Sequence, residues 1–321
     1  MKKKIIYFTI LIISLILLFF LSINLGSIKV SFGELCRGLF IEYNEKVAII
    51  YDLRFPRIII AMFAGAALSV SGVLFQAVMK NPLADPGIIG ISSGASLAVL
   101  IVISFFPSAY FLSPIFAFIG GIISFILVYC FAWNKGLNPL RLILTGIAIN
   151  AVFQGIIDGY ESMTSSTIMS NTISMKTWND VHLLVWYVII ALVLAFLLSN
   201  RCNLLLLEDK TVRSLGVNVY FLRIFISFVA VFLASIATAI VGVISFIALI
   251  VPHVARLIVG SDYKILIPFS CLLGAFTLLL ADTMGRLLFA PYEIPASIIM
   301  AIIGGPFLII LLRRSTTSYG N

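Results

Sequence analysis

The sequence predicts an all-α polytopic membrane protein, and three observations support this fold class. Hydrophobic residues make up 62% of the 321-residue chain. Charged residues make up only 11%, whereas soluble domains carry about 25%. The apolar runs are continuous and about 17–25 residues long, which suits helices that cross a hydrocarbon core of about 30 Å rather than the alternating strands of a barrel. Because lipid offers the backbone no hydrogen bonds, each run is expected to be helical.

The apolar segments predict about ten transmembrane helices. They cover residues 5–25, 54–79, 88–106, 114–133, 141–157, 181–199, 223–243, 245–259, 265–281 and 295–312. The first is too long for a signal-peptide core and no small-residue cleavage site follows it, so we expect a retained helix. Segment 245–259 is too short for a simple span and contains Pro252, so we expect a broken or buried helix there.

The basic residues predict the orientation of the chain. An even number of spans puts both termini on one side, and the positive-inside rule makes that side the cytoplasm. Of the 21 Lys and Arg residues, 13 then fall inside and 7 outside, with Arg256 inside a segment. Residues 26–52 and 158–180 become extracellular segments. The net charge of +8 therefore reflects membrane topology and not a nucleic-acid partner.

The cysteines and the small residues have simple interpretations. Cys36, Cys130, Cys202 and Cys271 lie far apart without metal-ligand spacing, so we expect neither a disulfide nor a metal site. Glycine, alanine and serine recur within segment 54–79 and in residues 90–95. Such spacing allows helices to approach closely in lipid. It is equally compatible with plain packing and with a path that moves.

Residues 203–222 form a polar stretch between two strongly apolar runs, with charges of both signs. In the predicted topology it faces the cytoplasm. The chain has no GxxxxGK[ST] phosphate loop, so it does not bind ATP in that manner.

Four motifs carry a family resemblance: RFPR (54–57), NPLADP (81–86), PHVAR (252–256) and PYEIP (291–295). In this order, they resemble the permease subunits of iron-complex and vitamin B12 ABC importers, the FecCD-like family, over nearly the whole chain. The resemblance implies a single transmembrane domain over residues 1–321 with type II ABC importer permease architecture. It implies a transport subunit without catalytic residues or bound cofactors, in the plasma membrane of a bacterium. The implied partners are an ATP-binding subunit that uses ATP and Mg²⁺, an extracellular substrate-binding lipoprotein, and a second permease copy or homologue.

The resemblance also assigns two contact regions. Arg54, Arg57 and Arg286 match arginines that pair with acidic residues on the binding protein, and a guanidinium suits bidentate carboxylate binding. Interfacial snorkelling is the alternative. The polar loop matches two short helices, here 209–215 and 219–223 split by Gly216, that seat in the ATPase. The loop's polar contacts are then Glu208, Lys210 and Arg213, and its groove-filling residues are Val212, Leu215 and Val217. An ordinary cytoplasmic loop is the alternative.

Other motif residues have mainly structural interpretations. Asn81, Pro82, Asp85 and Pro86 predict a stiff inner turn with a possible gating contribution. The family's inner-gate position matches Asn138, Pro139 and Leu140, although Pro139 replaces a small hydroxyl residue. Pro252, His253 and Arg256 are interpreted as structural, as are Asp282 and Glu293. Asp282 and Arg286 are four residues apart, which predicts an ion pair, and Glu293 is expected to cap or brace the last helix.

The sequence also bears on the identity of the cargo and on other classes of protein. Residues 173–184 and 293–306 look most like permeases of Gram-positive heme-iron uptake systems, which favours heme over a ferric siderophore or cobalamin. His182 at an outer helix edge is not expected to ligate heme, because tight binding would trap the cargo. An ion-coupled secondary transporter would need acidic residues mid-membrane, and the spans are nearly free of them. With two histidines in separate segments, an intramembrane enzyme is disfavoured. A channel remains an alternative on composition, although the polar loop argues against it.

Overall fold

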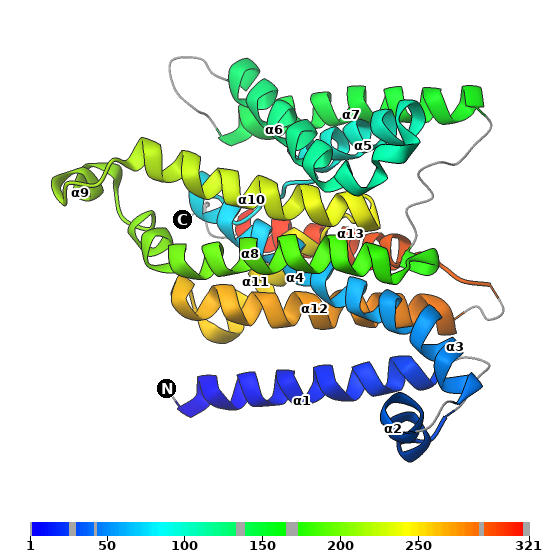
Figure 1. The fold of residues 1–321 in the computed structure, drawn as a ribbon. Coiled ribbons are helices and arrows are strands. Elements are labelled where there is room, and N and C mark those ends of the chain that lie inside the picture. Colours follow the sequence, from blue (N-terminus) through cyan, green and yellow to red (C-terminus); the bar gives the residue numbers. More distant parts are fainter. Residues whose placement is uncertain are drawn as a thin grey trace.

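The computed structural model describes residues 2–25, 30–41, 44–132, 139–164, 173–288 and 292–316. Every regular element within these ranges is helical (Figure 1). The elements are α1 (Lys2–Asn24), α2 (Phe32–Phe40), α3 (Glu45–Leu53), α4 (Phe55–Met79), α5 (Ile91–Phe105), η1 (Pro107–Leu112), α6 (Ser113–Ala132), α7 (Pro139–Thr164), η2 (Ile173–Met175), α8 (Trp178–Leu204), α9 (Asp209–Ser214), α10 (Val219–Val241), α11 (Ile247–Val259), α12 (Tyr263–Leu287) and α13 (Ala296–Thr316).

All ten predicted apolar segments form helices. In the described part of the chain, seven helical stretches are long and apolar enough to cross a membrane, and three apolar helices are shorter: Ile91–Phe105, Ile247–Val259 and Ala296–Leu311. The short segment before residue 260 forms α11, a 13-residue helix with Pro252 inside it. Its Leu249 and Val251 are almost fully buried. The prediction of a short buried helix there is confirmed.

Several helices extend beyond their predicted ends. α7 continues from residue 157 to Thr164, and α12 continues from residue 281 to Leu287. The polar residues that end an apolar run do not end a helix, because helix propensity differs little between apolar and charged straight-chain residues. Within the added turns of α12, Asp282 and Arg286 form an ion pair.

α4 lies in the middle of the bundle, between α12, α8 and α10 (Figure 1). Side-chain hydroxyls fasten it to two neighbours: Ser69 Oγ donates to Ser270 O at 2.7 Å, and Ser71 Oγ donates to Ala230 O at 2.7 Å. A Cβ at Gly65 would collide with the backbone of Gly274 on α12. A Cβ at Gly72 would collide with the Ala248 backbone on α11. At these positions the small residues serve close packing.

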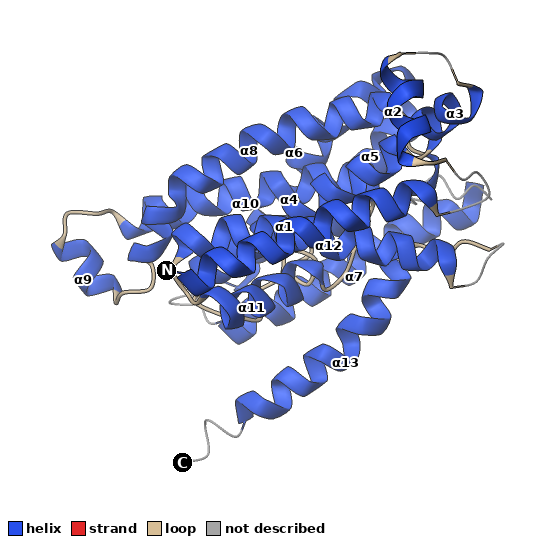
Figure 2. Ribbon diagram, turned by 90° about the horizontal axis from the view of Figure 1, so that it is seen from below, coloured by secondary structure: helices blue, strands red, loops and turns tan. Residues whose placement is uncertain are grey.

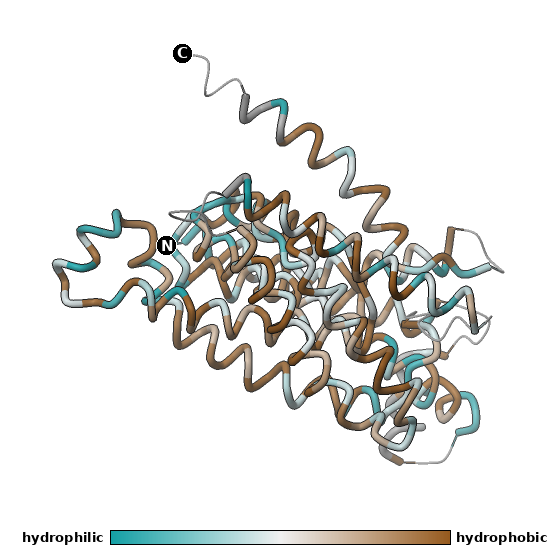
Figure 3. The backbone as a smooth tube through the Cα atoms, turned by 90° about the horizontal axis from the view of Figure 1, so that it is seen from above, coloured by the Kyte–Doolittle hydropathy of each residue, from teal (hydrophilic) through white to brown (hydrophobic). Residues whose placement is uncertain are grey.

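The bundle has two polar ends. α9 projects from one end, where α1 also begins, and α2 and α3 lie at the other end (Figures 1 and 2). We call these the α9 end and the α2–α3 end. Hydrophilic residues gather at both ends, and hydrophobic residues predominate between them (Figure 3). α13 leaves the body of the bundle at an angle (Figure 2), and Ile302 and Ile309 on it are exposed. The fold is therefore that of a multi-pass membrane protein.

The packing of α4 makes a testable prediction. Gly72→Ala is expected to lower the thermal unfolding midpoint in detergent, with a loss of about 1–3 kcal/mol, because the added methyl group meets the α11 backbone. Gly155→Ala on α7 is the matched control, since no atom lies within 4 Å of its Cβ position. Equal midpoints for the two variants would show that α4 and α11 are not in close contact.

Candidate functional site

At the α2–α3 end, a buried charge cluster joins α4 to α12. Pro56 occupies the first turn of α4, where a missing N–H costs nothing, and Arg57 follows it. The Arg57 guanidinium donates to both carboxylate oxygens of Asp282, with Nε–Oδ distances of 3.1 and 3.0 Å and an Nη2–Oδ1 distance of 2.9 Å. Its Nη1 also donates to Glu293 Oε2 at 2.7 Å. One arginine thus holds α4, α12 and the segment before α13 together.

Two further arginines extend the cluster to α1. Arg286 Nε lies 3.4 Å from Asp282 Oδ2, so the predicted pair within α12 is present. Arg286 also donates two hydrogen bonds to Ser22. Its Nη1 donates to the carbonyl oxygen of Ser22 at 3.3 Å, and its Nη2 donates to the Ser22 hydroxyl oxygen. Arg54 Nη1 donates to Ile23 O at 2.5 Å. The end of α1 is therefore fixed by two side chains, one from α12 and one from the junction of α3 and α4.

The geometry corrects two expectations for this end. The sequence placed Arg57 at an outer helix end, ready to meet a partner, but its side chain is only 8% exposed. A guanidinium at this depth needs a buried counter-charge, and Asp282, 225 residues away, supplies it. Glu293 binds Arg57 and is 47% exposed, whereas the sequence predicted that it would cap or brace the last helix. Arg54 and Arg286 are partly buried, and docking by these two arginines remains a prediction.

At the α9 end, Asp209 joins three elements. It lies in the first turn of α9. Lys80, directly after α4, donates to Asp209 Oδ1 at 3.0 Å and to Leu207 O at 2.7 Å. Arg223 in α10 donates to the same Asp209 oxygen at 2.9 Å. We call Lys80, Asp209 and Arg223 the Asp209 clamp.

The electrostatics of the clamp keep Asp209 ionised. Partial burial raises the pKa of Asp209, but the hydrogen bond from Lys80 and the charges of Arg223 and Lys80 outweigh it, so the pKa lies below its ordinary value. The sequence analysis did not single out Asp209. An acidic residue in a first helical turn is usually explained by the helix dipole alone, so the local pattern gave no sign of its distant partners.

The predicted coupling residues divide into exposed and buried ones. Glu208, Lys210, Arg213 and Leu215 are exposed, with Leu215 at 61%. Val212 is fully buried, so its assignment to a partner's groove is wrong. It lies on the apolar face that anchors α9 to its own chain. Val217 is half-buried against the core.

The loop also differs from the predicted pair of short helices. α9 ends at Ser214, and Gly216 follows with a φ of 76°, a left-handed conformation that favours glycine. The second predicted helix, 219–223, is the beginning of α10, a 23-residue helix. Asn218 caps it by accepting from Phe221 N at 3.1 Å. α9 is therefore joined by only four residues to a helix that crosses the bundle.

The NPLADP motif forms a rigid turn between α4 and α5. Asn81 Oδ1 accepts from Leu83 N at 2.9 Å. Asp85 Oδ1 accepts from Gly87 N at 2.6 Å and from Ile88 N at 3.2 Å. Within the motif Pro82 is exposed and Pro86 is buried. Lys80, which opens the turn, has a φ of 47°, so the clamp holds a residue in an uncommon backbone conformation.

Asp85 is a buried carboxyl group. It is 4% exposed, and its Oδ2 has no hydrogen-bond partner among the described residues. Burial raises the pKa of Asp85 from 3.8 to about 6, although the N–H groups of Ile88 and Gly87 oppose the change. Near neutral pH this turn therefore contains a carboxyl group close to its own titration range.

The remaining predicted residues have local roles. Arg256 Nη2 donates to Gln76 Oε1 at 3.1 Å and so links α11 to α4. His253 meets Phe307 edge to face, with ring centroids 5.8 Å apart. His182 is exposed on α8. Of the predicted inner gate, Asn138 lies outside the described residues. α7 begins at Pro139, and the side chains of Pro139 and Leu140 are likewise outside the description.

The comparison with protein families settles the class of the chain. The profile of the FecCD transport family matches residues 14–314. The chain belongs to the FecCD transport family. This FecCD permease is a transport subunit of an ABC importer and has no catalytic role of its own.

Individual relatives agree with the family over the whole chain. Two proteins named "Probable heme-iron transport system permease protein IsdF", from Staphylococcus aureus strains MSSA476 and Newman, are each 42% identical over 316 residues. Each alignment covers 98% of this chain and 97% of the relative. A solved structure of a metal-chelate type ABC transporter in an inward-facing conformation matches with a TM-score of 0.80 and 29% identity. It covers 95% of this chain and 97% of the other. The permease therefore has the type II ABC importer architecture.

The Arg57–Asp282 pair makes a prediction for this FecCD permease. Asp282→Asn is expected to cost about 3–5 kcal/mol of stability, because it removes the buried counter-charge of the Arg57 guanidinium and leaves only the half-exposed Glu293. Glu293→Gln is the control, since an exposed partner contributes about 1 kcal/mol or less. Thermal unfolding in detergent measures both. The double variant Arg57→Met with Asp282→Leu is expected to regain much of the loss, and equal stability of Asp282→Asn and Glu293→Gln would contradict the buried pair.

Asp85 predicts a pH dependence. The folded permease binds the Asp85 proton more tightly than the unfolded chain does, so this residue's contribution to stability falls as the pH rises from about 4 to about 6 and stays low above that. Asp85→Asn keeps the Oδ1 acceptor and removes the charge. We expect the variant to be more stable than the parent at pH 7, by about 3 kcal/mol at most, and equal to it near pH 4. A stability difference that does not change across this range would contradict a titrating Asp85.

Proposed function

We propose that this permease carries heme across the plasma membrane of a bacterium, as the membrane subunit of a binding-protein-dependent ABC importer. The identity of 42% to a heme-iron permease over 98% of the chain is the observation that carries this proposal. Residues 173–184 and 293–306 favour heme on sequence grounds as well. A ferric siderophore, or cobalamin, is the second candidate, because the structural relative is described only as a metal-chelate type transporter.

The proposed partners occupy opposite ends of the bundle. The ATP-binding subunit sits against the α9 end, where Leu215 offers an apolar contact surrounded by the exposed Glu208, Lys210 and Arg213. The binding lipoprotein sits on the α2–α3 end. There Arg54 and Arg286 are partly exposed, while Arg57 supports the surface from below. In this orientation the start of α1 and the α9 end face the cytoplasm.

A second permease copy completes the transport path. Only 17% of the most apolar stretch of α7 is buried within the chain. α13 presents exposed isoleucines as it leaves the bundle. In lipid, interfaces between helices depend on close packing rather than on hydrophobicity. Gly305 in α13 is a residue of the required size, and no atom of the described chain lies within 4 Å of its Cβ position. ATP binding and hydrolysis in the partner subunits then alternate the access of the path between the two membrane faces.

The test is substrate-stimulated ATP hydrolysis by the complete transporter in proteoliposomes. We expect heme-loaded binding protein to stimulate hydrolysis and heme import, and the same protein without heme, or a siderophore-loaded one, to have little effect. Stimulation by the ferric siderophore alone would overturn the heme proposal while leaving the family unchanged.

A control in the same assay checks the α9 contact. Leu215→Asp is expected to abolish stimulation while membrane insertion and folding remain normal, because a carboxylate cannot fill an apolar groove without desolvation. Leu215→Met keeps the apolar surface and is expected to transport normally. If Leu215→Asp also transports normally, α9 is a connector and not the ATPase contact.

A further inference from the structure

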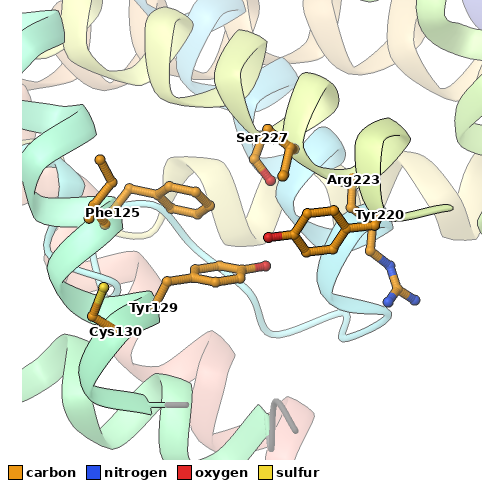
Figure 4. Close-up of a pocket in the computed structure, with 8 residues that line it drawn as sticks. Phe125, Tyr129, Cys130, Tyr220, Arg223 and Ser227 are labelled. Carbon is orange, nitrogen blue, oxygen red and sulfur yellow. The ribbon is translucent and has the colours of Figure 1, made fainter. Parts of the chain in front are cut away.

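A cavity of about 450 Å³ lies between α6 and α10 (Figure 4). It lies toward the α9 end, because Arg223 on its wall belongs to the Asp209 clamp. Most of its lining is apolar or aromatic. The lining residues are Phe125, Ile126, Tyr129, Cys130, Tyr220, Arg223, Ile224 and Ser227. The partner contacts proposed above do not involve this cavity.

Polar groups converge on the cavity without satisfying one another. Ser227 is 1% exposed, its Oγ points into the cavity (Figure 4), and this oxygen has no hydrogen-bond partner among the described residues. Arg223 Nε is likewise buried and without a partner in the described part of the chain. The hydroxyl groups of Tyr129 and Tyr220 both point into the space between the two helices (Figure 4). Buried polar groups in native proteins are nearly always hydrogen-bonded, so this arrangement points to a ligand.

The surroundings show what kind of molecule reaches the cavity. Ile126 is 52% exposed, Ile224 is 47% exposed and Phe228 is 46% exposed. An exposed apolar surface on membrane-spanning helices meets acyl chains. The cavity therefore opens toward the hydrocarbon of the bilayer, and its occupant is amphipathic.

The charge at the mouth selects among amphipathic molecules. The Arg223 guanidinium extends past Tyr220, away from Phe125 (Figure 4). Its Nη2 donates to Asp209 Oδ1 at 2.9 Å. An arginine and two tyrosines near the end of a span are typical of the headgroup level of a membrane. Guanidinium groups bind phosphate well.

We propose that this cavity binds an anionic glycerophospholipid from the leaflet at the α9 end. An acyl chain lies against Phe125, Ile126 and Ile224, and Ser227 Oγ donates to an ester carbonyl oxygen. The headgroup phosphate accepts hydrogen bonds from the Arg223 guanidinium at the edge of the cavity. The proposal rests on the lining of this cavity and does not depend on the identity of the cargo.

The bound lipid also meets the coupling machinery. Arg223 is shared between the phosphate and Asp209, and Asp209 connects α9 to Lys80 at the end of α4. Occupation of the cavity thus adds a negative charge next to the Asp209 clamp. The electrostatics of the α9 end therefore depend on which lipids surround the permease.

Cys130 on the cavity wall allows a direct test. It is a free, exposed cysteine, so bimane is attached to it in the full-length chain after Cys36, Cys202 and Cys271 are replaced by alanine. The labelled permease is placed in nanodiscs of phosphatidylcholine and phosphatidylglycerol, in which one or the other carries brominated acyl chains. We expect the brominated phosphatidylglycerol to quench the label with an apparent preference of about fivefold over phosphatidylcholine, the value for one basic residue at a membrane surface.

Two pairs of variants decide the outcome. Arg223→Gln is expected to abolish the preference, whereas Asp209→Asn, which breaks the same ion pair from the other side, is expected to retain it. Ser227→Leu fills the cavity and is expected to reduce quenching by both lipids, and Ser235→Ala, a buried change elsewhere on α10, is expected to leave it unaltered. Equal quenching by the two lipids, a preference that survives Arg223→Gln, or quenching unchanged by Ser227→Leu would each overturn the proposal.

Discussion

The close contact of α4 with α11 and α12 is the constraint on which the rest of this permease depends. In lipid, apolar side chains gain little by leaving the solvent, so helices associate through van der Waals contact and interhelical hydrogen bonds. α4 meets this condition with glycines that touch neighbouring backbones and with Ser69 and Ser71, which donate to carbonyl oxygens on α12 and α10. A helix so closely surrounded has no room to bend independently and moves with its neighbours.

This central helix connects the two polar ends of the bundle, at which we propose that the partners bind. At the α2–α3 end Arg57 binds Asp282 of α12, and at the α9 end Lys80 binds Asp209 beside α10. The charged groups therefore lie where α4 leaves the closely packed region. Domain movements in transporters are commonly rigid-body shifts of packed helices. A displacement of α9 by the ATPase would reach both α4 and α10 through one carboxylate.

The two charge clusters have different physical characters. Arg57 and Asp282 are both almost fully buried, so removal of either partner leaves a buried charge that only Glu293 or Arg286 still compensates. The residues of the Asp209 clamp are about one-third exposed, with side-chain exposures from 28% to 37%, so the clamp can open and close at little cost. A permanent brace at one end and a reversible link at the other suit a protein that holds its shape against a docked partner and transmits movement from an ATPase.

The sequence by itself determined the class of the protein, its apolar segments and the identity of its motifs. These follow from local properties: the length of each apolar run, the absence of a phosphate loop, and the spacing of residues within motifs such as NPLADP. The short helix α11 was also predictable, because Pro252 and its length mark it locally. The resemblance to iron-complex permeases was recognisable for the same reason, since each motif is contiguous.

Only the tertiary structure decided which residues face each other. The pairing of Arg57 with Asp282 spans 225 residues, and the link of Lys80 to Asp209 spans 129. The structure also separated Val212, which is buried, from Leu215, which is exposed, although both are apolar and three residues apart. For α9, which projects from the bundle, six residues are too few to show a hydrophobic periodicity. For the helices that cross the membrane, the physical reason is that their lipid-facing and protein-facing sides are both apolar. Hydropathy therefore locates a helix without showing which side meets the protein, and only the packing of neighbouring helices supplies that information.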